Sequence, residues 1–272
     1  MSFIALTIAG SDPSGGAGIQ ADLKTFHQFG VYGASAITLL TVQNTQRVSR
    51  VEVTPAELVI QQIDAVLEDM APGAAKTGAL GSSEVIRAVA ERASRFTFPL
   101  VVDPVMISKH GAPLLGADAR AILIADLLPH AFLATPNWHE ALDLAGLRES
   151  ENNDYESLSH QAAHAILAMG AKAVLIKGGH RPASLSSAPS NESNDLLYHD
   201  SEVYLYAAPR IDTQHTHGTG CTYSAAITAL LAKGMELVQA VGVAKQFIHR
   251  AIVSNPGIGG GYGPVNHFAK TE

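Results

Sequence analysis

Cysteine is nearly absent from this sequence, because Cys221 is the only one in 272 residues. A single cysteine excludes an intrachain disulfide, and the first residues lack the basic segment and long apolar run of a signal peptide, so we expect a cytoplasmic protein. No apolar run approaches the ~20 residues that a membrane-spanning helix requires. Basic side chains are also scarce, with 18 Lys and Arg against 25 Asp and Glu. The net charge of -7 argues against a surface that attracts nucleic acid or anionic lipid, so an anionic ligand would have to be held locally.

What the sequence does contain is an alternation of short apolar segments with helical patterns. Strands separated by helices of this length predict a mostly parallel sheet with helices on both faces, an α/β fold. No linker, repeat or shift in composition divides the chain, so we predict a single domain over residues 1–272. The predicted strands are residues 4–9, 33–42, 74–77, 100–103, 132–135 and 173–176, and the helical patterns are residues 19–29, 82–93, 117–128, 140–145, 160–169 and 225–231.

Three further segments carry local predictions. Thr54-Pro55-Ala56-Glu57 has the residues of a helix start, with Thr54 as N-cap and Pro55 at the first helical position. Residues 196–198 and 203–206 predict an antiparallel hairpin at the far end of the sheet. Residues 184–195 are of low complexity and predict a mobile surface loop.

A glycine-rich turn, Gly10 to Gly18, follows the first predicted strand and precedes a helix. This arrangement predicts a ligand loop at the carboxyl end of a parallel sheet. Residues 16–21 satisfy the Gly-x-Gly-x-x-Ala pattern of dinucleotide sites, but the second strand offers no acidic residue for a ribose, which disfavours a nicotinamide site. That strand delivers Gln43 instead. Its amide is either an ordinary loop side chain or a reader of the donor and acceptor edge of a heterocycle.

A second glycine-rich stretch, His215 to Ser224, runs straight into an apolar helical pattern. Gly218 and Gly220 permit a tight turn that exposes backbone N–H groups, and the helix that follows adds the positive end of its dipole. Such a cradle binds anions, most often phosphate, with Cys221 at the helix start. An ordinary loop-to-helix joint is the alternative that this stretch alone leaves open.

Polar groups fall at four predicted strand ends, namely Asp103, Asn137 with Glu140, Lys177, and the Gly218 to Cys221 cradle. The carboxyl ends of parallel strands face one crevice, so we expect these groups to meet there. Taken singly, Asp103 and Glu140 are better explained as cap or first-turn residues, and for Lys177 a solvated strand end is the alternative. Together they supply a cation for phosphates, oxygen ligands for magnesium and oriented N–H groups, which is what phosphoryl transfer requires.

Six motifs in a fixed order make the prediction more specific. They are Gly10 to Gly18, Thr41-Val42-Gln43-Asn44-Thr45, Asp103-Pro104-Val105-Met106, Thr135-Pro136-Asn137, Lys177-Gly178-Gly179-His180 and Thr216 to Thr222. In this order they resemble the hydroxymethylpyrimidine/phosphomethylpyrimidine kinase family of thiamine biosynthesis, within the ribokinase superfamily. The resemblance covers residues 4–268 and implies a ribokinase-like fold.

The resemblance implies an enzyme that uses magnesium ATP to phosphorylate the hydroxymethyl group of 4-amino-5-hydroxymethyl-2-methylpyrimidine, and then its monophosphate to the diphosphate. It implies that Gln43 reads the aminopyrimidine edge and that Lys177 holds ATP phosphates. A homodimer is also implied. The other implied site residues are Gly10, Ala17 and Val42 around the substrate, Asn137 and Glu140 on magnesium through water with Asp103 nearby, and Gly218, Thr219 and Gly220 as the anion hole.

Cys221 stands where sugar kinases of the superfamily carry an aspartate base, and the pyrimidine kinases resemble this chain in having cysteine there. A thiol at a helix N-terminus can have its pKa lowered, which makes a thiolate base chemically reasonable. The alternative is a small residue that packs at a helix start. A loose phosphoryl-transfer transition state asks little of a base, so electrostatic positioning by Gly218 to Cys221 is the competing explanation of the rate.

Other interpretations remain open. Ala79 stands where the resembling family usually has a methionine against the pyrimidine, and residues 184–195 look longer than the family's loop. Some relatives with the same Gly-Thr-Gly-Cys signature accept pyridoxal, so pyridoxal kinase is one alternative, and a non-catalytic nucleotide-binding module on the same fold is another. His215 and His217 show no metal-ligand spacing and are predicted to be solvated or packed histidines.

Overall fold

The computed structural model describes residues 3–107, 111, 114–115, 118–149, 155–180 and 191–271. The strands are β1 (Ile4–Ser11), β2 (Tyr32–Gln43), β3 (Val48–Val53), β4 (Ala74–Thr77), β5 (Leu100–Val102), β6 (Leu133–Ala134), β7 (Val174–Ile176), β8 (Glu192–His199) and β9 (Glu202–Pro209). The α-helices are α1 (Gly18–Gln28), α2 (Ala56–Asp69), α3 (Ser83–Ala93), α4 (Ala119–Ile122), α5 (Trp138–Ala145), α6 (Tyr155–Ala168), α7 (Thr219–Ala232) and α8 (Leu237–Val253). Among the described residues, no helix is both long enough and apolar enough to cross a membrane.

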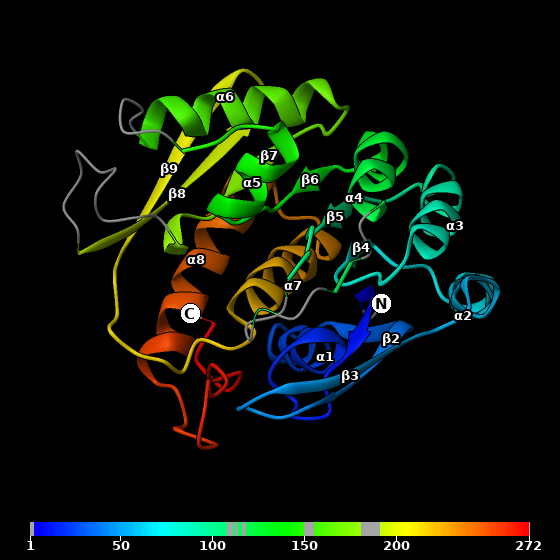
Figure 1. Ribbon diagram of the computed structural model, residues 1–272, viewed down its shortest axis with the longest axis horizontal. Helices are drawn as coiled ribbons and strands as arrows, with labels where there is room; N and C mark the ends of the chain where they lie inside the picture. Colours follow the sequence, from blue (N-terminus) through cyan, green and yellow to red (C-terminus); the bar gives the residue numbers. More distant parts are fainter. Residues whose placement is uncertain are drawn as a thin grey trace.

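The nine strands of the described residues form one sheet, in the order β3-β2-β1-β4-β5-β6-β7-β8-β9. Neighbours from β2 to β7 are parallel, whereas β3, β8 and β9 pair antiparallel with their neighbours. Figure 1 shows the β2–β3 pair and the β8–β9 hairpin at opposite ends of the sheet. The predicted α/β class, with a mostly parallel sheet, is confirmed.

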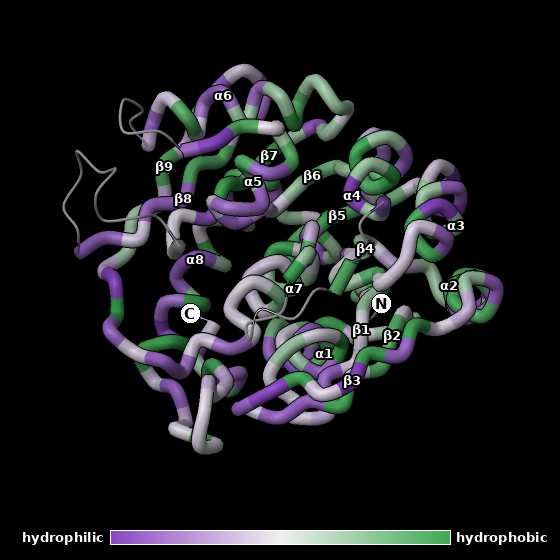
Figure 2. The backbone as a smooth tube through the Cα atoms, viewed as in Figure 1, coloured by the Kyte–Doolittle hydropathy of each residue, from purple (hydrophilic) through white to green (hydrophobic). Residues whose placement is uncertain are grey.

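Helices cover both faces of the sheet because successive strand residues point to opposite sides. In β5, Leu100 and Val102 pack into a core with α2, α3, α5 and α6, while Val101 packs into a second core with α1, α7 and α8. In α7 every residue from 222 to 232 is buried, which is the pattern of a helix enclosed on all sides. Figure 2 shows hydrophobic residues on the central strands, whereas the outer helices alternate between hydrophobic and hydrophilic residues.

The site edge of the sheet lies at the carboxyl ends of the parallel strands. The chain passes from β1 to β2, which lies on one side of β1 in the sheet. After β3 and α2 the chain returns to β4, which lies on the other side of β1. Ligands bind outside such a switch point in α/β sheets. The loop after β1, the end of β2, and the residues that follow β5 and β7 all lie at this edge.

The structure corrects two strand predictions. The sequence analysis missed β3, whose Ser49, Arg50 and Glu52 are exposed, because an edge strand carries polar residues that weaken the apolar pattern. In the predicted loop 184–195, residues 192–195 instead begin β8, whose backbone pairs with β9 along its full length. Residues 184–190 lie outside the described residues. The predicted hairpin is confirmed and is longer than expected.

Helix boundaries also differ from the prediction. Pro55, not Thr54, is the N-cap of α2, because the Thr54 N–H donates to the Thr38 carbonyl oxygen at 2.9 Å and remains part of the sheet edge. The helix predicted at 160–169 begins at Tyr155, and the one predicted at 117–128 continues from α4 into a π turn (Leu123–Leu127) and a 3-10 turn (Leu128–His130). The sequence analysis did not identify α8.

A buried ion pair connects α1 to β4 beneath this edge of the sheet. Lys76 Nζ lies 2.9 Å from Asp22 Oδ2, and neither side chain is exposed. Thr7 Oγ1 donates to the same carboxylate oxygen at 2.6 Å. Burial alone would lower the pKa of Lys76, but the carboxylates of Asp22 and Asp103 together raise it. Burial raises the pKa of Asp22 as well, although the charge of Lys76 opposes that rise. Lys76 is therefore a fixed positive charge inside the fold.

Candidate active site

The ends of β5 and β7 bring Asp103 and Lys177 together. Lys177 Nζ lies 2.9 Å from Asp103 Oδ1, Thr135 Oγ1 donates to the same oxygen at 3.2 Å, and Ser224 Oγ donates to Oδ2 at 3.1 Å. Burial opposes ionisation of Asp103, but the ammonium groups of Lys177 and Lys76 hold the pKa of this carboxyl below its usual value. Burial likewise opposes the charge on Lys177, yet Asp103 and Glu140 raise its pKa. Both groups of the pair are therefore charged at neutral pH.

The predicted anion cradle lies beside this pair. Gly218 is the N-cap of α7 with a φ of 78°, and a side chain on it would collide with the carbonyl oxygen of Gly16. Only glycine lets the two glycine-rich segments approach so closely. A Cβ atom added to Gly220 would lie 3.3 Å from Lys177 Nζ and 3.8 Å from Asp103 Oδ2. The positive end of the α7 dipole and the Lys177 ammonium thus meet at one point, where they favour an anion.

Thr219 and Cys221 lie in the first turn of α7. The Thr219 hydroxyl and the Thr219 backbone N–H both donate to the Thr216 carbonyl oxygen, at 2.7 and 3.2 Å, so an anion at Thr219 would have to compete with that carbonyl for the N–H. Burial raises the pKa of Cys221 to about 12, although the Lys76 ammonium opposes that rise. The pKa of this thiol is thus raised rather than lowered, because desolvation, which disfavours the thiolate form, outweighs the charge of Lys76.

Asn137 and Glu140 form a reciprocal capping box at the start of α5. The Asn137 N–H donates to Glu140 Oε2 at 2.8 Å, and the Glu140 N–H donates to Asn137 Oδ1 at 3.0 Å. Burial raises the pKa of Glu140 to about 7, although Lys177 counteracts it. The contacts of Glu140 are therefore those of a helix-capping residue. Its side-chain oxygens and that of Asn137 can still accept hydrogen bonds from water.

A magnesium ion at this edge would need water and substrate phosphates among its ligands, in addition to protein side chains. Among the described residues, no group of three or more His, Cys, Asp or Glu side chains is placed to hold a metal. Magnesium is usually bound by one or two carboxylates, several waters and substrate phosphates. The oxygens of Asp103, Asn137 and Glu140 fit that incomplete, water-mediated kind of site.

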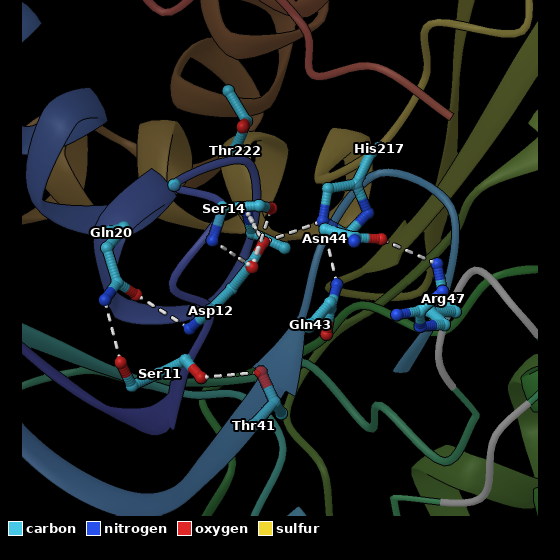
Figure 3. Close-up of polar contacts among 12 residues, drawn as sticks. Ser11, Asp12, Ser14, Gln20, Thr41, Gln43, Asn44, Arg47, His217 and Thr222 are labelled. Atoms are coloured by element: carbon cyan, nitrogen blue, oxygen red, sulfur yellow. Dashed lines mark hydrogen bonds and ion pairs between the residues drawn. The ribbon is translucent and has the colours of Figure 1, made fainter. Parts of the chain in front are cut away.

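A second polar cluster lies where the loop after β1 meets the end of β2 (Figure 3). His217 Nε2 lies 2.7 Å from Asp12 Oδ2 and 3.1 Å from Gln43 Nε2. Asp12 also accepts from the Ser14 N–H and the Ala17 N–H, both at 2.9 Å. Sequence reasoning identified Gln43 but missed Asp12 and treated His217 as a solvated or packed residue. The Asp-x-Ser turn pattern and the position of His217 beside the cradle were the available signals.

The remaining predicted substrate residues divide into two groups. Ala17 reaches the cluster through its backbone N–H, and Gly10 lies against Leu39, where a Cβ atom would be 2.5 Å from Leu39 Cδ1. The Val42 side chain is 57% exposed, and the pairing of β2 with β3 shifts register between Val42 and Gln43. The Val42 side chain is thus largely open to solvent, whereas Gln43 contacts His217.

Comparison with known proteins identifies the family. The model of the family described as phosphomethylpyrimidine kinase matches residues 12–266. The chain belongs to this family. It is 47% identical over 266 residues to the hydroxymethylpyrimidine/phosphomethylpyrimidine kinase of Bacillus subtilis, which covers 97% of this chain and 94% of that relative. The predicted kinase activity is thereby confirmed, and the non-catalytic alternative is set aside.

Solved structures confirm the ribokinase-like fold. Bacillus subtilis pyridoxal kinase, in a complex with ADP, superposes with a TM-score of 0.87 at 35% identity, over 99% of this chain and 98% of that one. Phosphomethylpyrimidine kinase from Clostridium difficile superposes with a TM-score of 0.78 at 40% identity, over 92% of this chain and 100% of that one. Both kinds of vitamin kinase thus share this fold.

Replacing Glu140 by Gln tests the charge on this residue without removing the capping box, since Gln accepts the same N–H. The folded pKa of about 7 lies above the ordinary value of 4.5, so the unfolded chain loses its proton first as pH rises. Burying Glu140 therefore costs stability that grows between about pH 4.5 and 7, up to about 3 kcal/mol. We expect thermal unfolding in magnesium-free buffer to give similar Tm values near pH 4.5 and a higher Tm for Glu140→Gln above pH 7. A difference that does not change with pH would contradict the raised pKa.

Proposed function

We propose that this chain transfers the γ-phosphoryl group of ATP to the hydroxymethyl group of 4-amino-5-hydroxymethyl-2-methylpyrimidine, and then phosphorylates the monophosphate to the diphosphate that thiamine diphosphate biosynthesis consumes. The observation that carries the proposal is the meeting of the Lys177 ammonium with the positive end of α7 beside Gly220. Similarity to the Bacillus subtilis enzyme over 97% of the chain supports the choice of substrate.

Lys177 and the cradle supply the electrostatic part of the reaction. Lys177 contacts the phosphates of ATP, and the backbone N–H groups of Gly218 and Gly220 face the oxygens of the phosphoryl group in transfer. The Thr219 N–H joins them by exchanging its bond to the Thr216 carbonyl oxygen for one to the phosphoryl group. Fixed positive groups of this kind stabilise developing charge without reorganisation during the reaction. Magnesium, when bound, neutralises phosphate charge, and Asp103, Asn137 and Glu140 would hold it through its water ligands.

Gln43, Ala17, Gly10 and the backbone of Val42 surround the pyrimidine in this proposal. The amide of Gln43 pairs with the amino group and the adjacent ring nitrogen, which present one donor and one acceptor. The polar cluster at the end of β2 and the cradle at the start of α7 are directly connected through His217 and Gly218. The base and the reacting hydroxymethyl group can therefore be held at the same time.

Pyridoxal phosphorylation is the second candidate. The structural match to Bacillus subtilis pyridoxal kinase favours it, as does Ala79, whose small side chain leaves more room than methionine. We expect ADP release with magnesium ATP to be faster with hydroxymethylpyrimidine and with its monophosphate than with pyridoxal. A preference for pyridoxal would transfer the assignment to vitamin B6 salvage, and activity on the first pyrimidine alone would remove the second step.

Substitutions of Cys221 and Lys177 compare how much each residue contributes to kcat. Because the Cys221 pKa is raised to about 12, we propose that fixed positive charge rather than a thiolate base carries most of the rate. Lys177→Met is expected to lower kcat about 100- to 1000-fold, the usual cost of removing one electrostatic stabiliser, and Cys221→Ser less than about tenfold. Steady-state kinetics, with circular dichroism as the control for folding, measure both. A serine variant as slow as Lys177→Met would restore the cysteine to the role of principal base.

We also propose a homodimer. Leu40 and Val42 are 52% and 57% exposed and lie on one face of β2, beyond the helices that cover the rest of the strand. A second copy that covers these side chains would remove apolar surface from water. Sedimentation velocity is expected to give a dimer that weakens in Leu40→Lys, and a monomer at every concentration would refute the proposal. We also propose that the enzyme works in the cytoplasm, since a chain with a single cysteine forms no intrachain disulfide and suits a reducing compartment.

A further inference from the structure

Asp12 is a fully engaged carboxylate. It is 3% exposed, and its Oδ1 accepts from the backbone N–H of Ser14 at 2.9 Å and from the Ser14 hydroxyl at 2.7 Å. Its Oδ2 accepts from the Ala17 N–H at 2.9 Å and contacts His217 Nε2 at 2.7 Å. Burial opposes ionisation, but the hydrogen bonds from His217 and Ser14 hold the pKa of Asp12 below its usual value. Three donors other than His217, namely the Ser14 N–H, the Ser14 hydroxyl and the Ala17 N–H, already point at its two oxygens, so Asp12 acts as an acceptor and has no hydrogen to give.

The hydrogen of the 2.7 Å contact must therefore belong to His217 Nε2. A bare ring nitrogen would point its lone pair at a carboxylate oxygen, which is repulsive at this distance, whereas an N–H donates to it. His217 is 4% exposed and held between the two glycine-rich segments, so the ring cannot turn away from Asp12 without opening the loop. The carboxylate consequently determines that Nε2 acts as a donor.

The same Nε2 atom also contacts Gln43, and this decides how the amide is turned. The end of the amide drawn toward His217 in Figure 3 is its nitrogen, at 3.1 Å, which would place two donors against each other. An amide nitrogen and an amide oxygen occupy nearly the same space, so the neighbouring groups decide between them. Rotating the amide by half a turn places Oε1 where it shares the His217 N–H with Asp12. We infer that the Asp12–His217 pair locks the Gln43 amide with its oxygen toward His217 and its NH2 group toward the substrate.

The lock has a consequence for specificity, which rests on the proposed function. A free glutamine amide can turn over, and so can pair with an edge that offers acceptor and donor in either order. A locked amide donates to a ring nitrogen and accepts from the amino group beside it. It rejects the 4-oxo analogue, whose ring N–H and carbonyl oxygen present the reverse order, because the mismatch buries unpaired donors and acceptors.

The test compares the 4-amino substrate with its 4-oxo analogue, both bearing the hydroxymethyl group. In the wild type we expect kcat/KM to favour the amino compound by at least about 100-fold. In His217→Ala, and separately in Asp12→Asn, the ratio is expected to fall to within about tenfold, because Gln43 becomes free to turn. Loss of activity on both compounds with the ratio retained would mean that the pair only stabilises the loop, and would overturn the inference.

His267→Ala is the matched control. His267 is another buried histidine, 6% exposed, whose Nε2 lies 3.1 Å from Thr222 Oγ1. Its removal is expected to leave the ratio unchanged, and a collapse of the ratio in this variant would also overturn the inference.

Neutron diffraction of the deuterated wild-type protein without substrate separates this inference from the proposed function. A deuteron on His217 Nε2 directed at Asp12, with the Gln43 oxygen nearest to it, is the expected result. An ND2 group facing His217 would refute the lock whatever the substrate proves to be. If the wild type phosphorylates neither pyrimidine, the proposed function fails, and the neutron map still decides the orientation of Gln43.

Discussion

The site depends on a close approach between two backbone segments that are far apart in the sequence. The Cα of Gly218 lies against the carbonyl oxygen of Gly16, at a distance that no side chain would allow. This contact joins the loop after β1 to the start of α7, and it brings His217 within reach of Asp12. Without it, the polar cluster of Asp12, His217 and Gln43, which we propose faces the heterocycle, and the cradle at Gly218, which we propose faces phosphate, would not lie side by side.

Charge around the cradle is arranged in two layers. Lys177 and Asp103 form the layer nearest α7, and Lys76 with Asp22 form a layer beneath it that is closed to solvent. Each lysine is neutralised by a partner carboxylate, yet the lysine of the upper pair points at the helix start. Positive charge is thus available to a phosphoryl group in transfer, while the carboxylates keep both lysines ionised inside the fold.

Much of the fold could be predicted because the relevant signals are local. Short apolar runs between helical patterns gave the parallel strands, and residues that follow strands, such as Asp103 and Lys177, were expected at one edge for that reason. The features that the sequence analysis missed depend on residues far apart in the chain. Strand β3 depends on pairing with β2 rather than on its own polar sequence, the pKa of Cys221 depends on how tightly α7 is enclosed, and Asp12 and His217 are 205 residues apart.

The pair of Lys76 and Asp22 affects how the enzyme responds to its medium. Dissolved ions screen charges that water can reach, as at the exposed pair of Arg50 and Glu52. They cannot enter between two side chains with no exposed surface. The electric field that Lys76 contributes beneath α7 is therefore determined mainly by the fold, and it changes far less with the ionic strength of the cell than the field of a surface pair does.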